Sequence, residues 1–140
     1  MATPVTLVND AGTAYSGSVP QAYGGSAAIS VTSGNAAAAI ATATIPAVSA
    51  KTNYITGFDV TGTGATAGLA VAITIAGLAG GSITYTYAAA AGVTVANTPL
   101  LIRFPAPIPA SAVNTAITVT CPSLGASNTN NVINAFGFNA

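Results

Sequence analysis

The feature that most constrains the fold is an alternation of apolar and polar residues with a period of two, which recurs along the chain. It is clearest at 82–87, where Ile83, Tyr85 and Tyr87 fall on one side and Ser and Thr residues on the other. Successive side chains of a β-strand point to opposite faces, so this pattern predicts a strand with one buried face. The remaining strands are expected at 36–45, 53–61, 69–75, 100–104, 117–121 and 131–138.

Gly, Pro and Asn residues separate these runs, as expected for turns, and no window combines a period of 3.6 with a helix cap. Seven or eight short strands without intervening helices predict an all-β fold, namely an antiparallel β-sandwich of the jelly-roll type over residues 36–140. The segment 104–114 contains Pro105, Pro107 and Pro109, which have no N–H group to donate. We expect it to be an extended, unpaired crossing between the two sheets.

The alternation also assigns side chains to faces. In the run 53–61 it places four residues on one face, namely Tyr54, Thr56, Phe58 and Val60. Cys121 is expected to be a buried, inert thiol on the same face as Ile117 and Val119, and a single cysteine cannot form an intrachain disulfide. Phe136 with Phe138, and Tyr85 with Tyr87, are interpreted as core pairs. Aromatic platforms that stack on sugars remain the alternative for both pairs.

Residues 1–35 differ from the rest of the chain. They are rich in Gly and Ser and hold one short apolar run at 5–8, so this segment buries little by itself. It is interpreted as an extended N-terminal arm, with Val5 and Leu7 adding to a sheet edge on another subunit. The alternative is a flexible terminus with no such role.

Charge is almost absent from the chain. Of 140 residues only 3% are charged, namely Asp10, Lys51, Asp59 and Arg103, and the formal net charge at pH 7 is zero. Without electrostatic repulsion between copies, self-association is expected. Two dispersed cations cannot neutralise enough phosphates for nucleic-acid binding or for attachment to an anionic membrane. Asp59 and Arg103 are interpreted as assembly contacts that pair across strands or across a subunit interface, with solvated surface charges as the simpler alternative.

The residues needed for catalysis or for metal binding are scarce. There is no histidine, there are two carboxylates, and there is one cysteine. A Ser-His-Asp or Cys-His arrangement cannot be built, and zinc or calcium ligand clusters are not available. The glycine-rich stretches lack the Lys-Ser/Thr that follows a phosphate-binding loop. We therefore expect no enzyme activity and no cofactor, and we find no signal-peptide or membrane-spanning pattern.

Several motifs resemble small structural proteins of tailed bacteriophages. These are Tyr-Ile-Thr-Gly at 54–57, Leu-Ala-Gly-Gly at 78–81 before a Thr-Tyr strand, Phe-Pro-x-Pro-Ile-Pro-Ala at 104–110, and Asn-Ala-Phe-Gly at 134–137. The opening at 4–10, Pro-Val-Thr-Leu-Val-Asn-Asp, is similar to the start of such chains. The resemblance covers about the last hundred residues well and the arm weakly.

The resemblance implies a virion protein of the decoration or cement type. Such proteins are β-rich oligomers, commonly homotrimers, which bind the major capsid protein on the outside of the head after synthesis in the host cytoplasm. The alternative that it leaves open is a tail-fibre, head-fibre or adhesin module that binds a host surface glycan. No residue-level functional signature comes with the resemblance.

Overall fold

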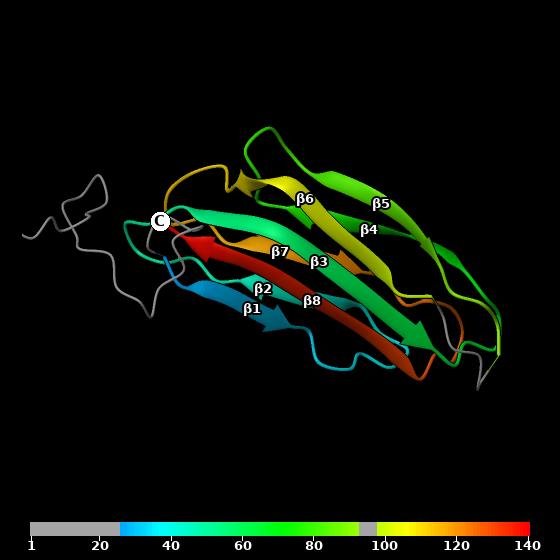
Figure 1. Cartoon of the computed structure of the whole chain (residues 1–140). Helices are drawn as coiled ribbons and strands as arrows, with labels where there is room; N and C mark the ends of the chain where they lie inside the picture. Colours follow the sequence, from blue (N-terminus) through cyan, green and yellow to red (C-terminus); the bar gives the residue numbers. More distant parts are fainter. Residues whose placement is uncertain (1–25, 93–97) are drawn as a thin grey trace, which may run out of the picture.

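The computed structural model describes residues 26–92 and 98–140, which form eight β-strands arranged as two four-stranded sheets (Figure 1). One sheet has the strand order β1-β8-β3-β6 and the other has the order β2-β7-β4-β5. The strands are β1 (Ala28–Thr32), β2 (Ala41–Ile45), β3 (Asn53–Thr63), β4 (Ala70–Ala76), β5 (Ile83–Ala88), β6 (Leu100–Pro109), β7 (Ile117–Cys121) and β8 (Asn130–Asn139).

The prediction of an all-β antiparallel sandwich is confirmed. Every strand pairing is antiparallel, and no helix occurs in the described ranges. In particular, these ranges hold no helix that is long and apolar enough to cross a membrane. The pairings are nested in the sequence, because β1 joins β8, β2 joins β7, β3 joins β6 and β4 joins β5.

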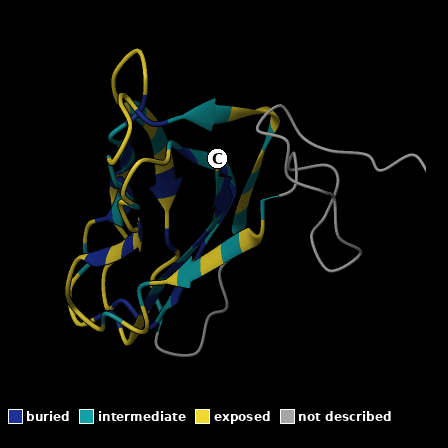
Figure 2. Ribbon diagram, turned by 90° about the vertical axis from the view of Figure 1, so that its left-hand side faces the viewer, coloured by how far each residue is buried: buried dark blue, intermediate teal, exposed yellow. Residues whose placement is uncertain are grey.

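The hydrophobic core lies between the two sheets (Figure 2). Buried and more exposed residues alternate along β2 and β7, as the period-two pattern predicts. Burying an aliphatic or aromatic side chain stabilises a fold by about 1.5–3 kcal/mol, so this layer holds the sheets together. The largest fully buried apolar side chains are Phe58, Ile45, Ile55, Ile73, Ile75, Ile117, Leu124 and Ile133.

A β-bulge interrupts the regular pairing of β3 with β8. Ile55 pairs with Gly137 and Gly57 pairs with Phe136, so Thr56 is an extra residue on β3. An extra residue in one strand reverses the inward and outward phase of the alternation beyond it.

The bulge changes which side chains of β3 reach the core. Ile55, Phe58 and Val60 are buried between the sheets, whereas Tyr54 is only half-buried on the outer face. The prediction that Tyr54 and Thr56 share a face with Phe58 and Val60 is therefore wrong. The sequence alternation is regular there, but the inserted residue shifts the phase of the strand.

The N-terminal strand shows that the sandwich begins earlier than predicted. β1 lies within residues 1–35, the range assigned to the arm, and it pairs with β8 from Ala28 opposite Phe138 to Thr32 opposite Asn134. The described body therefore starts before residue 36. Residues 1–25 of the predicted arm, including Val5 and Leu7, lie outside the described residues.

The proline-rich segment belongs to a strand, contrary to the prediction of a crossing loop. β6 extends to Pro109 at the edge of its sheet, where a missing N–H on the solvent side has little cost. Ile55 of β3 pairs with Ile108, and Gly57 pairs with Arg103, so residues 104–107 are unpaired against β3. Pro105 and Pro107 fall in this unpaired stretch, and the crossing to β7 follows at 111–116.

Buried asparagines tie the ends of the two sheets together. Asn131 of β8 is 0% exposed, and its side-chain amide donates to the carbonyls of Ala39 (3.1 Å) and Pro122 (3.1 Å), which flank strands of the other sheet. Asn53 of β3 is also 0% exposed and donates to the carbonyls of Pro46 and Thr115 at 2.9 and 2.8 Å. These bonds cross from one sheet to the other where no strand pairing does.

Candidate interaction surface

The outer face of the β1-β8-β3-β6 sheet carries a group of aromatic and charged side chains. We call it the aromatic face. It consists of Tyr54 and Asp59 from β3, Leu101 and Arg103 from β6, and Asn134, Phe136 and Phe138 from β8. Strand register brings them together, because residues paired across antiparallel strands point to the same face.

Arg103 crosses a gap in the sheet surface to reach an aromatic ring. Gly57 stands between Arg103 on β6 and Phe136 on β8 in the same row. A Cβ at Gly57 would collide with the carbonyl oxygen of Ile102 and lie 2.9 Å from the Arg103 Cδ. The absence of a side chain at Gly57 therefore leaves space for the Arg103 side chain to extend over β3. Its guanidinium carbon lies 4.7 Å from the centre of the Phe136 ring. A cation over a ring at an exposed site is worth roughly 0.5–1 kcal/mol.

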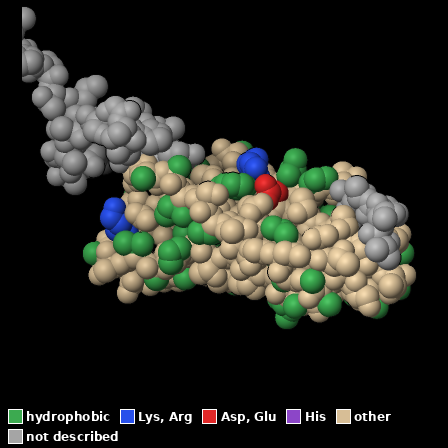
Figure 3. Space-filling view, turned by 90° about the horizontal axis from the view of Figure 1, so that it is seen from below, with side chains coloured by type: hydrophobic (Ala, Val, Ile, Leu, Met, Phe, Trp, Pro, Cys, Tyr) green, Lys and Arg blue, Asp and Glu red, His purple; other side chains and the backbone are tan. Residues whose placement is uncertain are grey.

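Backbone carbonyls and one carboxylate fix the arginine in this position. Its Nη1 donates to the carbonyls of Phe58 and Ile102 at 3.1 and 2.8 Å, and its Nη2 lies 3.9 Å from Asp59 Oδ2. Asn134 donates to the other Asp59 oxygen at 2.9 Å. Figure 3 shows one basic and one acidic group side by side on a surface with few charges. The Arg103 side chain is 56% exposed, so the ion pair adds little stability but presents a preformed polar group.

Apolar surface surrounds this polar group. Tyr54 and Phe138 stack with ring centroids 4.9 Å apart and planes inclined by 6°. Leu101, which pairs with Asp59 across β3 and β6, is 64% exposed. An arginine stacked on an aromatic ring is typical of the centre of a protein–protein contact, and the exposed leucine beside it adds apolar area that a partner could bury.

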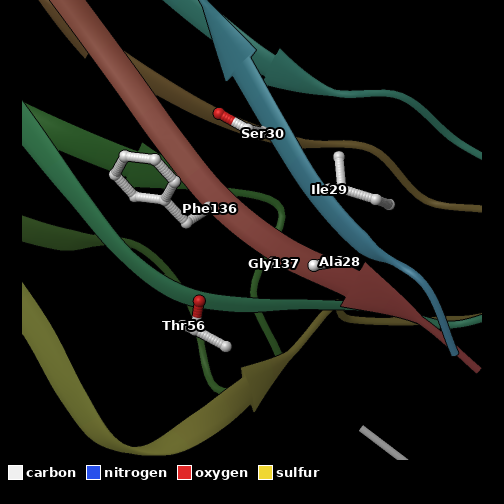
Figure 4. A pocket seen from close by; sticks show the side chains of 6 residues that line it. All are labelled: Ala28, Ile29, Ser30, Thr56, Phe136 and Gly137. Carbon is white, nitrogen blue, oxygen red and sulfur yellow. The ribbon is translucent and has the colours of Figure 1, made fainter. Parts of the chain in front are cut away.

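A shallow hollow of about 170 Å³ lies beside Phe136, between β1, β8 and β3 (Figure 4). It is lined by Ala28, Ile29, Ser30, Thr56, Phe136 and Gly137. Typical pockets for drug-sized ligands have volumes of roughly 300–1,000 Å³. The hollow therefore has room for one side chain of a partner protein or for part of a single sugar ring.

The outer face of the other sheet has a contrasting chemistry, and we call it the threonine face. Thr42, Thr120, Thr74 and Thr84 form one row across β2, β7, β4 and β5. The other threonines on this face are Thr44, Thr86 and Thr118, and its remaining strand positions are alanines. The four strands that form this face contribute no charged or aromatic side chain to it.

The two charged residues predicted as assembly contacts, Asp59 and Arg103, lie together on the aromatic face. Val5 and Leu7, the other two, lie outside the described residues. Sequence reasoning placed Phe136 in the core, but the side chain lies on the outer face under Arg103. The alternation along 131–138 does not reveal this, because it groups Phe136 with Val132 and Phe138 and sets the larger apolar side chains opposite the buried Ile133 and Ala135.

Phe138 and the two tyrosines of β5 differ from one another. Phe138 is buried, as predicted, with 8% of its surface exposed, but it packs against Tyr54 on the outer side of the sheet. Tyr85 makes an edge-to-face contact with Phe58 at 5.4 Å. Tyr87 is buried in the core and donates to the carbonyl of Thr98 at 3.2 Å. The tyrosines therefore pack inward, as predicted, and do not form an exposed sugar platform.

Reactive groups in the described body are protected. Cys121 is buried, as predicted, and burial raises the pKa of its thiol to about 11, although a hydrogen bond with Asn131 acts in the opposite direction. Burial also raises the pKa of Tyr87, with a further contribution from Cys121. Within residues 26–92 and 98–140, no three His, Cys, Asp or Glu side chains cluster as metal ligands.

The two outer faces of the sandwich therefore differ in chemistry. The aromatic face combines fixed polar groups with large exposed apolar side chains, whereas the strands of the threonine face present threonines and alanines. No protein-family model, curated protein or solved structure matches the chain.

Proposed function

We propose that this protein is a non-catalytic structural protein of a tailed-bacteriophage particle, a decoration or cement protein that binds the outside of the head. The observation that carries the docking part of this proposal is the difference between the two outer faces of the sandwich. The resemblance of the sequence motifs to phage structural proteins supplies the particle and the major capsid protein as the partner.

The aromatic face has the composition of a docking surface. Aromatic residues and arginine are enriched at the centre of protein interfaces, and alanine, serine and most charged residues are depleted there. Arg103 and Phe136 match this composition and Leu101 adds exposed apolar area, whereas the alanines and threonines of the other face do not match it. The threonine face would therefore remain in contact with solvent after docking.

The sandwich is proposed to be a jelly roll, and copies of it to form a homotrimer. Nested strand pairing, with the first strand joined to the last and each inner pair enclosed by the next, supports the jelly-roll topology. A chain with zero net charge supports association of copies, since nothing repels them. The choice of a trimer rests on the resemblance to phage decoration proteins, which are commonly homotrimers.

Many contacts of modest affinity, repeated over the phage head, would suit a protein that stabilises the capsid shell. A standard interface buries roughly 800 Å² on each partner, and apolar burial contributes about 25 cal/mol per Å² before the costs of association. An oligomer that engages several capsid subunits at once binds more tightly than each single contact. One ion pair among largely apolar contacts makes such docking nearly independent of salt.

A structural role also agrees with the state of the polar groups. Asp59 is engaged by Asn134 and Arg103, and the sequence has no histidine to act as a general base near it. Cys121 is buried with a raised thiol pKa, which opposes formation of the nucleophilic thiolate.

The experiment that tests the proposal is co-sedimentation with empty, expanded heads of the encoding phage, prepared without this protein. We expect saturable binding at a fixed number of copies per head. Leu101→Lys should weaken binding at least tenfold, because it places a charge at the centre of the contact. Thr42→Lys on the threonine face is the matched control and should bind like the wild type. Absence of saturable binding by the wild-type protein would refute the proposal.

The hollow beside Phe136 supports a second candidate, a fibre or adhesin module that binds a host glycan. Its lining combines one aromatic ring with the hydroxyl groups of Ser30 and Thr56, which could contact part of a single sugar ring (Figure 4). A host-polysaccharide array would then give a hit that Phe136→Ala removes. The decoration role instead predicts no hit on that array.

A further inference from the structure

One side of the sandwich is less well closed than the other. β5 and β6 are edge strands of the two sheets and lie on the same side of the body (Figure 1). Apart from the buried Tyr87, the inward-facing apolar side chains of these two strands pack against the core but are only half-buried, unlike those of the central strands. We call this region the β5–β6 seam. It consists of Ile83 and Tyr85 from β5 and of Leu100, Ile102 and Phe104 from β6.

The two edges of the seam differ in how they are protected. β6 carries Pro105, Pro107 and Pro109 and an irregular pairing with β3, which prevent another strand from pairing along it. β5 has no proline, no charged residue and no bulge, and it pairs regularly with β4 from Ile83 to Ala88. An unprotected edge of this kind is a template for an added strand.

We propose that residues 5–8 of a second copy of this chain add as a strand to the free edge of β5 and close the seam. Val5 and Leu7 would then share one face and cover Ile83 and Tyr85. Thr6 would point to the other side and continue the row that ends at Thr84. The inference deepens the proposed homo-oligomer by naming its contact, and it does not require docking on a phage head.

The N-terminal segment is long enough to reach its own β5 edge or that of a neighbour, and the self-association expected of a chain with zero net charge selects the neighbour as the recipient. The segment joins the described body just before β1, which lies at the opposite edge of its sheet from β6 (Figure 1). Residues 9–25 can span at most about 55 Å at ~3.3 Å per residue. A four-stranded sheet is only about 15–20 Å wide at ~4.8 Å between strands. If each copy donates its N-terminal segment to the next copy, the contacts run head to tail and can close into a ring. A homotrimer is one such ring.

The test compares two double variants of the full chain that carry the same added charge. Val5→Asp with Leu7→Asp places both carboxylates on the face that would enter the seam. Thr6→Asp with Val8→Asp is the control, because its carboxylates would face solvent. The measurements are mass by light scattering and amide hydrogen exchange of residues 83–87.

The expected result is a wild-type oligomer with protected β5 amides. The first variant should give a monomer of 13.4 kDa whose β5 amides exchange at least tenfold faster, and the control should behave like the wild type. A wild-type monomer with protected β5 amides would show that the segment occupies its own seam. An oligomer unaffected by the first variant, or equal dissociation of both variants, would also overturn the inference. Failure to bind phage heads would leave these solution results unchanged, so the two proposals can fail separately.

Discussion

The guanidinium of Arg103 lies 4.7 Å from the centre of the Phe136 ring, although the two residues belong to strands that do not pair with each other. The intervening strand contributes Gly57 to that row, and its missing side chain makes the contact possible. A backbone position without a side chain therefore determines what the aromatic face presents to a partner.

Gly57→Ala should destabilise the fold by about 1–3 kcal/mol, since the new methyl group would collide with the Ile102 carbonyl and crowd the Arg103 side chain. Urea unfolding followed by circular dichroism measures this change. Arg103→Ala is the matched comparison and should cost less than about 1 kcal/mol, because the side chain is largely exposed. Equal effects of the two substitutions would argue against steric control by Gly57.

Asn131→Ala should cost roughly 1–3 kcal/mol, because the fully buried amide donates to the carbonyls of Ala39, Pro122 and the buried Cys121 at the end of the sandwich. Asn134→Ala is the control on the same strand, since its side chain faces outward and bonds Asp59. Its loss should be below about 1 kcal/mol. Chemical denaturation of both variants tests the difference, and a control as destabilised as Asn131→Ala would contradict the role assigned to Asn131.

Cys121 should be unreactive toward a thiol reagent at pH 8 in the native protein and reactive after unfolding, because burial raises its thiol pKa to about 11. The folded protein holds this proton more tightly than the unfolded chain. The associated stability is therefore complete below about pH 8.5 and declines as pH rises toward 11, by up to about 1.4 kcal/mol per pH unit. Tyr87, whose pKa is also raised, acts in the same direction.

Cys121→Ala isolates the thiol's contribution. The variant should lose the cysteine part of the alkaline decline in the free energy of unfolding, whatever its stability at neutral pH. An identical decline in the wild type and the variant would show that the thiol is not responsible.

The mass of the oligomer should be the same at low and high salt. The described surface holds one arginine–aspartate pair, and the chain has no net charge, so screening removes little attraction and little repulsion. Light scattering across a salt series measures this directly. Dissociation at high salt would mean that ion pairs hold the copies together.

The sequence predicts the fold class because alternation and burial have the same period wherever pairing is regular. Ile117, Val119 and Cys121 lie on the buried face of β7, as the pattern requires. The pattern fails for Tyr54, because the bulge at Thr56 is a property of pairing with β8 that local sequence does not reveal. It also did not identify β1, which lies in a Gly- and Ser-rich region and is stabilised by its partner strand.

The sequence predicts only some of the residues of the aromatic face. The scarcity of charges singled out Asp59 and Arg103, and the structure brings them together. Phe136 was misassigned because residues facing the core on β8 include Ala135 and a glycine, which are smaller than the phenylalanine on the outer face. Large residues outside and small residues inside reverse the usual relation between size and burial.

The most direct test of the account is the binding of wild-type protein and of Leu101→Lys to empty phage heads that lack this protein. The account predicts saturable binding of the wild type, a loss of at least tenfold in affinity for Leu101→Lys, and wild-type affinity for Thr42→Lys. Tight binding by Leu101→Lys together with loss of binding by Thr42→Lys would place the docking surface on the threonine face and contradict the central claim.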